Sequence, residues 1–273
     1  MRCYILILAA MVMVACRKEA KLTPSEPEAV KLLPQGNHSY DDSIMAAYNK
    51  YSTFILYRFT QHDYNYNQID KKIDSAFNAN PAYIGPALRF VYDNLFNALP
   101  ERLLQKTMPY RILLASYIGG KHTRSAVNFS ATYAALTIGW ADSTLLQQST
   151  PAQMNVLRKN LIRFYMERAF RAGAISTPAD FAALAPADYS NIQTPALKNQ
   201  YGIIEPTGAY LTLGTDFLGY VEAICTRSMA DMESTYFSPG VDVKGNYRLK
   251  YNAVINYFQS EFGINLQEVG NAF

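Results

Sequence analysis

The chain has 273 residues, of which 49% are hydrophobic, and this is enough for one sizeable domain or two small ones. Its formal net charge is +3, and its basic residues are scattered along the sequence rather than clustered. A nucleic-acid-binding surface would require such a cluster, so we expect no nucleic-acid partner.

The first sixteen residues, MRCYILILAAMVMVAC, have the pattern of a cleaved secretion signal. A basic start at Arg2 precedes an apolar run over residues 4–14 that is too short to span a bilayer. The ending M-V-A-C resembles a bacterial lipobox, in which the cysteine is lipidated and becomes the first mature residue. We therefore predict a lipoprotein signal peptide over residues 1–15 and an anchor of acyl chains, palmitate among them, on Cys16. An ordinary signal peptide with an incidental cysteine is the alternative.

The next segment, residues 16–36, is charged and contains prolines, which is typical of a flexible tether. No repeat or second linker follows, so residues 37–273 are predicted to form a single domain. After Cys3 leaves with the signal and Cys16 is lipidated, Cys225 is the remaining cysteine. It lies in an apolar helical stretch and has no cysteine partner, so we expect a small buried side chain.

The first half of the domain mixes helices and strands. Apolar residues at helical spacing predict a helix over residues 41–54, and Pro81 opens a long helical pattern to residue 107 that Pro100 interrupts. Alternating aromatic and β-branched residues predict strands over residues 55–61, 109–118 and 132–140.

The second half is mainly helical. Thr150 and Pro151 predict the start of a helix that Gly173 ends, and a wide apolar stripe lies between them. Thr215 is the predicted N-cap of a helix over residues 216–229. Shorter or later helices are expected over residues 177–184 and 249–263. Strands in the first half and helices in the second favour an α+β fold.

Six stretches, taken in order, resemble the zinc-binding metallopeptidase lipoproteins of Gram-negative outer membranes, also described as substrate import-associated zinc metallohydrolase lipoproteins. The stretches are the first helix with ILYRFTQ, the helical section from Pro81 to Leu104, PYRILLASYI, FYMERAF with the ISTPADF segment after it, GTDFLGYVEA, and EFGINLQEV. The resemblance covers most of the mature chain. It implies a zincin-like scaffold with a mixed sheet in the N-terminal half.

The resemblance also implies where a zinc site would lie. In H-E-x-x-H, histidines at i and i+4 share one helical face and bind Zn²⁺ while the glutamate polarises a water. In FYMERAF, Met166 and Phe170 stand at the two histidine positions, and Glu167 keeps the general-base position. In GTDFLG, Thr215 and Gly219 stand at the two glutamates of the family's E-D-F-A-E segment, one of which would be the third ligand.

This chain is therefore predicted to be a degenerate member with no zinc ligands and no cofactor. Glu167 is expected either to form helix ion pairs with Arg163 and Arg171 or to keep a polar role in a vestigial cleft. Met166, Phe170 and Gly219 should then converge within side-chain reach of Glu167.

Three functions follow as hypotheses. The first is a catalytically inactive pseudo-enzyme of the outer membrane, on its periplasmic or outer face, that binds a peptide, a glycan or another lipoprotein of a TonB-dependent, starch-utilisation-type nutrient import system. The second is an active zinc metallohydrolase with non-standard ligands. The third is a glycan-binding surface lipoprotein in which Tyr64, Tyr66 and neighbouring polar residues make the contact. Whether the chain is an enzyme stays open at this point.

Overall fold

The folded unit begins a few residues before the expected boundary. The computed structural model describes residues 32–66, 74–120, 128–144, 150–206 and 210–272, and the compact unit starts at Leu32. Leu33 is buried, and the Gln35 Oε1 atom accepts hydrogen bonds from the N–H groups of Tyr57 (2.8 Å) and Arg58 (3.0 Å). Residues 32–36, expected in the tether, therefore belong to the domain. The predicted signal peptide, Cys16 and the rest of the tether lie outside the described residues.

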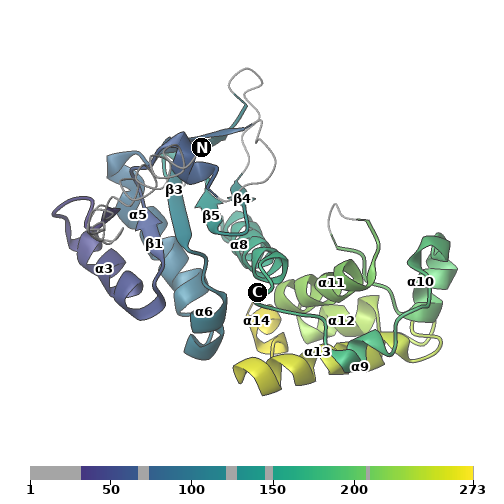
Figure 1. The fold of residues 1–273 in the computed structure, drawn as a ribbon. Helices are drawn as coiled ribbons and strands as arrows, with labels where there is room; N and C mark the ends of the chain where they lie inside the picture. Colours follow the sequence, from purple (N-terminus) through teal and green to yellow (C-terminus); the bar gives the residue numbers. More distant parts are fainter. Residues whose placement is uncertain (1–31, 67–73, 121–127, 145–149, 207–209, 273) are drawn as a thin grey trace, which may run out of the picture. The chain divides into compact units, whose positions relative to one another are not determined.

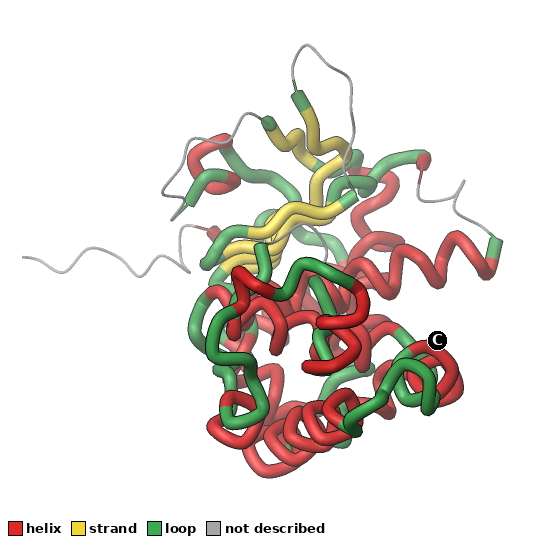
Figure 2. The backbone as a smooth tube through the Cα atoms, turned by 90° about the vertical axis from the view of Figure 1, so that its right-hand side faces the viewer, coloured by secondary structure: helices red, strands yellow, loops and turns green. Residues whose placement is uncertain are grey.

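A mixed sheet occupies the N-terminal half (Figures 1 and 2). Its central strand β3 (Arg111–Gly119) pairs in parallel with β1 (Phe54–Leu56) and β5 (Ala135–Ile138). β4 (Phe129–Ala131) runs antiparallel to β5, and β2 (Ser75–Asn78) runs antiparallel to the second half of β3. Residues 111–115 of β3 are all buried, as expected for a strand that is covered on both faces.

Two of the three predicted strands are confirmed, and the third is shorter than predicted. β3 and β5 lie within the predicted ranges 109–118 and 132–140, apart from the last residue of β3. The strand expected over residues 55–61 is wrong beyond Leu56, because the Thr60 hydroxyl accepts a hydrogen bond from the Asp63 N–H (3.2 Å) and caps the short helix α4 (Gln61–Tyr64).

Helices flank this sheet in the first half. The predicted helices are present as α3 (Ser39–Tyr51) and as a broken series that ends at α6 (Glu101–Thr107), with Pro100 at the break. The series begins with the 3₁₀ turn η1 (Pro81–Tyr83) and α5 (Ile84–Val91), which continues into the π-helical turn η2 (Tyr92–Phe96).

The long helix α8 (Pro151–Arg171) links the sheet to the helical half. It starts as predicted, because the Thr150 hydroxyl accepts a hydrogen bond from the Gln153 N–H (3.3 Å), and it ends before Gly173, whose φ is +73°. It packs against β4 and β5 on one side and against α11 on another.

The C-terminal half is helical, which confirms the α+β prediction (Figure 2). Its elements are α9 (Ala179–Ala182), η3 (Tyr189–Asn191), α10 (Pro195–Tyr201), α11 (Leu213–Thr226), α12 (Met229–Thr235), α13 (Asn246–Phe262) and α14 (Gln267–Asn271). The helix expected over residues 216–229 starts earlier and ends at Thr226, since Arg227 has an extended backbone. Within the described ranges, no helix combines the length and the apolar character needed to cross a bilayer.

Candidate functional site

The last turns of α8 carry the positions expected for zinc-binding histidines. Met166 is fully buried, and Phe170 lies one turn further along the same side of the helix. The Phe170 ring lies 5.8 Å from the ring of Phe217 on α11. This face of α8 is thus an apolar packing surface.

Glu167 lies between these two residues in sequence and forms an ion pair. Its carboxylate contacts the Nη2 atom of Arg171 one turn away, and the Glu167 side chain is 17% exposed. This confirms one of the two expected helix pairs, which stabilises the helix by a few tenths of a kcal/mol. Arg163 instead places its guanidinium carbon 4.4 Å from the Phe164 ring centroid. Glu167 is therefore paired with an exposed arginine.

The start of α11 differs from the sequence prediction. The N-cap is Thr212 rather than Thr215: the Thr212 hydroxyl accepts from the Thr215 N–H (3.2 Å), and the Thr215 hydroxyl oxygen accepts from the Thr212 N–H (2.7 Å). The Thr215 hydroxyl also donates to the carbonyl of Tyr210 (2.6 Å). Thr215 is thus the third residue of the helix and closes its first turn, as in a capping box.

Gly219 faces away from α8. A Cβ atom at Gly219 would lie 1.9 Å from the carbonyl oxygen of Ile204, whereas a Cβ atom at Gly214 would lie 3.0 Å from the Phe170 ring. Phe217, which contacts Phe170, is two residues or about 200° around the helix from Gly219. The chain at residues 204–205 passes too close to α11 for any side chain at Gly219, so this position could not carry a ligand side chain in this fold. The expected convergence of Gly219 with Glu167 stays a prediction.

These residues do not fit a zinc ion. Zinc sites in proteins use cysteine sulfur, histidine nitrogen or carboxylate oxygen, whereas Met166 offers a buried thioether and Phe170 offers no donor atom. Among the described residues, no group of three or more His, Cys, Asp or Glu side chains is placed to hold a metal ion. His38 stacks on Tyr40, with ring centroids 4.8 Å apart, and His122 lies outside the described residues.

Behind α11 lies a buried polar cluster that the sequence analysis missed. The Lys250 ammonium on α13 lies 2.6 Å from the Asp216 carboxylate, and neither side chain is exposed to solvent. The Tyr189 hydroxyl donates to the same carboxylate oxygen (2.9 Å), and the Ile204 N–H approaches the other one (3.4 Å). Lys250 also donates to the carbonyl of Gly202 (3.2 Å). These contacts join α11 to α13, and they join the two helices to Tyr189 and to the backbone of residues 202–204.

Burial opposes charge on both members of this pair. Desolvation raises the pKa of the Asp216 carboxyl above its ordinary value, although Lys250 attracts its charged form. Desolvation likewise lowers the pKa of the Lys250 ammonium, against the attraction of Asp216. Because no solvent reaches either group, the pair joins two helices and is closed to a substrate. A lysine within the apolar spacing of Tyr247, Lys250 and Val254 is the sequence signal that could have indicated it.

The tyrosines proposed for glycan binding do not form an exposed face. Tyr64 is buried, and its hydroxyl lies 3.2 Å from the Ser130 hydroxyl. The Tyr66 ring lies 4.1 Å from the guanidinium carbon of Arg111, which is itself buried. The hypothesis that Tyr64 contacts a glycan is therefore wrong. Cys225 is a free buried thiol, as expected, and burial raises its pKa well above the ordinary range.

Comparison with known proteins supports the fold alone. No protein-family profile matches the chain, and no curated protein matches it in sequence. Among solved structures, the chain resembles a candidate zinc-binding metallopeptidase from Bacteroides caccae, with a TM-score of 0.53 and 13% sequence identity. The similarity covers 86% of this chain and 91% of that one. The chain therefore shares the fold of that structure over 86% of its length.

Proposed function

We propose that this protein is a non-catalytic relative of the zinc metallopeptidases, and that it acts by binding rather than by hydrolysis. The observation that carries this proposal is the chemistry of the α8 turn, where the sequence resemblance aligns Met166 and Phe170 with the two histidines of H-E-x-x-H. Neither side chain can bind Zn²⁺, and the remaining Glu167 is paired with Arg171.

The packing around this turn supports the same proposal. Phe170, Phe217 and Phe181 form a chain of ring contacts between α8, α11 and α9, with centroid distances of 5.8 and 5.5 Å. A catalytic zinc site keeps one open position for water and substrate. Around Phe170 aromatic rings pack together instead, and they join α8 to α11 and α9.

The proposed place of action is the cell envelope. A lipid anchor on Cys16, followed by a tether, would hold the domain at the outer membrane beside the transporter and binding lipoproteins of a nutrient import system. This step rests on the sequence pattern and on family analogy. Labelling of growing cells with a palmitate analogue tests the anchor: the label should be lost in Cys16→Ala and kept in the control variant Cys225→Ala.

A peptide digestion assay tests the absence of hydrolysis. The purified, zinc-supplemented protein is incubated with a complex peptide library, and new peptide termini are identified by mass spectrometry. We expect no termini beyond those of a sample without protein. Cleavage that persists in Glu167→Gln would come from a contaminant, whereas cleavage that this substitution abolishes would contradict the proposal.

A further inference from the structure

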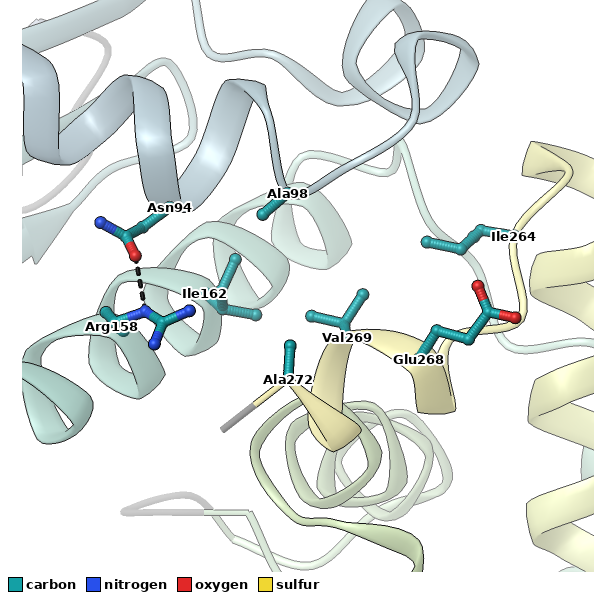
Figure 3. A pocket seen from close by; sticks show the side chains of 8 residues that line it. All are labelled: Asn94, Ala98, Arg158, Ile162, Ile264, Glu268, Val269 and Ala272. Atoms are coloured by element: carbon teal, nitrogen blue, oxygen red, sulfur yellow. Dashed lines mark hydrogen bonds between the residues drawn. The ribbon is translucent and has the colours of Figure 1, made fainter.

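A cavity of about 150 Å³ lies against the first half of α8, where η2 and the C-terminal segment around α14 meet it (Figure 3). Apolar side chains, including Ile162 and Val269, form its middle, and Ile264 lies beside Glu268. Asn94 and Arg158 lie at one side of this apolar middle, and Glu268 lies at the other. The cavity thus combines an apolar body with charges of opposite sign.

The positive side of the cavity is held in place by the backbone. The Arg158 Nε–H donates to the Asn94 Oδ1 atom (2.6 Å), and the Asn94 side-chain amide donates to the carbonyl of Phe90 (2.7 Å). Asn94 belongs to the π-helical turn η2, a geometry that is rare and often found at functional sites. The guanidinium plane of Arg158 is thereby fixed, and a planar guanidinium is well suited to bind a carboxylate.

The cavity can be placed relative to residues 166–170 of α8, which we call the altered zinc turn. Arg158, Ile162, Met166 and Phe170 follow one another at intervals of four residues along α8, and because each step adds about 40° of rotation, Phe170 points about 120° around the helix from Arg158. Each interval is about 6 Å. The last two residues are packed, and Phe170 meets the aromatic rings of α11, whereas the first two line the cavity. The cavity therefore lies upstream of the former ligand positions along α8.

We propose that this cavity binds a short zwitterionic molecule with an apolar body, of the size and chemistry of an apolar dipeptide. The carboxylate of the ligand would pair with Arg158, its ammonium group would face Glu268, and its side chains would contact Ile162 and Val269. This inference names a ligand class for the binding role proposed above and rests on that role, although it uses different residues from the altered zinc turn.

Three related ligands test the assignment of charges. Binding to the full folded domain is measured by NMR titration with Ala-Ala, with N-acetyl-Ala-Ala, which lacks the cation, and with Ala-Ala-amide, which lacks the anion. The affinity should decrease in that order, because Arg158 is partly buried and fixed by Asn94 whereas Glu268 is exposed. An affinity for Ala-Ala-amide equal to that for Ala-Ala would overturn the proposal, and so would the absence of saturable binding of Ala-Ala.

Matched variants test the residues. Arg158→Gln should weaken Ala-Ala binding by about tenfold or more, and Glu268→Gln by about threefold, while Glu261→Gln, an exposed carboxylate on α13, should change nothing. A second variant, Ile162→Phe, fills the cavity and should also weaken binding. Because Glu268 is exposed, Glu268→Gln should fold and can be measured even if Ile162→Phe does not fold. Unchanged affinity in both Arg158→Gln and Glu268→Gln would overturn the proposal. Hydrolysis of Ala-Ala during the titration would instead contradict the non-catalytic role, so the two failures are distinguishable.

Discussion

Helix α11 has an apolar face toward α8 and a buried charged group on its other side. Toward α8, Gly214 and Phe217 pack against the Phe170 ring. Toward α13 and the preceding loop, Asp216 pairs with Lys250 and Gly219 packs against the Ile204 backbone. The Asp216 carboxylate of α11 therefore serves the helical half as a buried structural group, whereas the contacts of Gly214 and Phe217 with α8 are apolar.

Removal of the buried Lys250 cation should have the largest effect on the stability of the domain. Lys250→Met leaves the Asp216 carboxylate buried without its partner, so we expect a loss of about 3–5 kcal/mol in the free energy of unfolding, measured by urea denaturation. The control variant Lys244→Met removes an exposed lysine and should change stability by less than about 0.5 kcal/mol. Equal stability of the two variants would show that the pair is not buried as described.

Substitution of the α11 glycines should have the next largest effect on stability. It tests the two faces of α11 separately, because Gly214 lies on one face and Gly219 on the other. Gly219→Ala places a methyl group into the Ile204 backbone and should destabilise the domain by about 3 kcal/mol. Gly214→Ala meets the edge of the Phe170 ring, which can shift, and should cost about 1 kcal/mol. At Gly240 a methyl group would meet nothing within 4 Å, so Gly240→Ala serves as the control. A larger cost at Gly214 than at Gly219 would reverse the assignment of the two faces.

The pH dependence of stability should show the smallest effect, because the attraction within the pair offsets part of its desolvation. Burial raises the pKa of Asp216 above its ordinary 3.8, so folding favours the protonated carboxyl, and its stabilising contribution is lost as the pH rises from below 3.8 through the folded-state pKa. Burial lowers the pKa of Lys250 below its ordinary 10.5, so the corresponding contribution is present above 10.5 and lost as the pH falls through the folded-state pKa.

The measurement is the difference in unfolding free energy between the wild type and Asp216→Asn/Lys250→Met. The stability of the wild type relative to this variant should be lowest at neutral pH and should rise toward both acidic and alkaline pH. An opposite trend, with the wild type gaining most at neutral pH, would mean that the attraction between the two ions exceeds their desolvation.

Local chemistry in the sequence explains which parts of the fold could be predicted. The start and end of α8 follow from Thr150, Pro151 and Gly173, whose effects act within a few residues. The cap of α11 was misplaced because Thr212 and Thr215 both take part in one capping box, and the sequence alone does not show which of them precedes the helix.

The candidate sites depend on longer-range contacts and were harder to predict. Lys250 and Asp216 are separated by 34 residues, and nothing near Asp216 in sequence indicates its partner. The role of Gly219 depends on the path of residues 204–205, and the cavity at Arg158 is formed by three separate segments. The residue types of the last turns of α8 could be identified from the sequence, but their packing partners could not.

Zinc content is the most direct test of the central claim. The described domain is loaded with excess zinc, dialysed and analysed by plasma mass spectrometry, beside the variant Met166→His/Phe170→His. We predict far less than one zinc per chain in the wild type, because Met166 and Phe170 supply no ligand and Gly219 faces Ile204. A rise in retained zinc in the double variant would show that the assay detects ligands at this turn. Stoichiometric zinc in the wild type after dialysis would contradict the account.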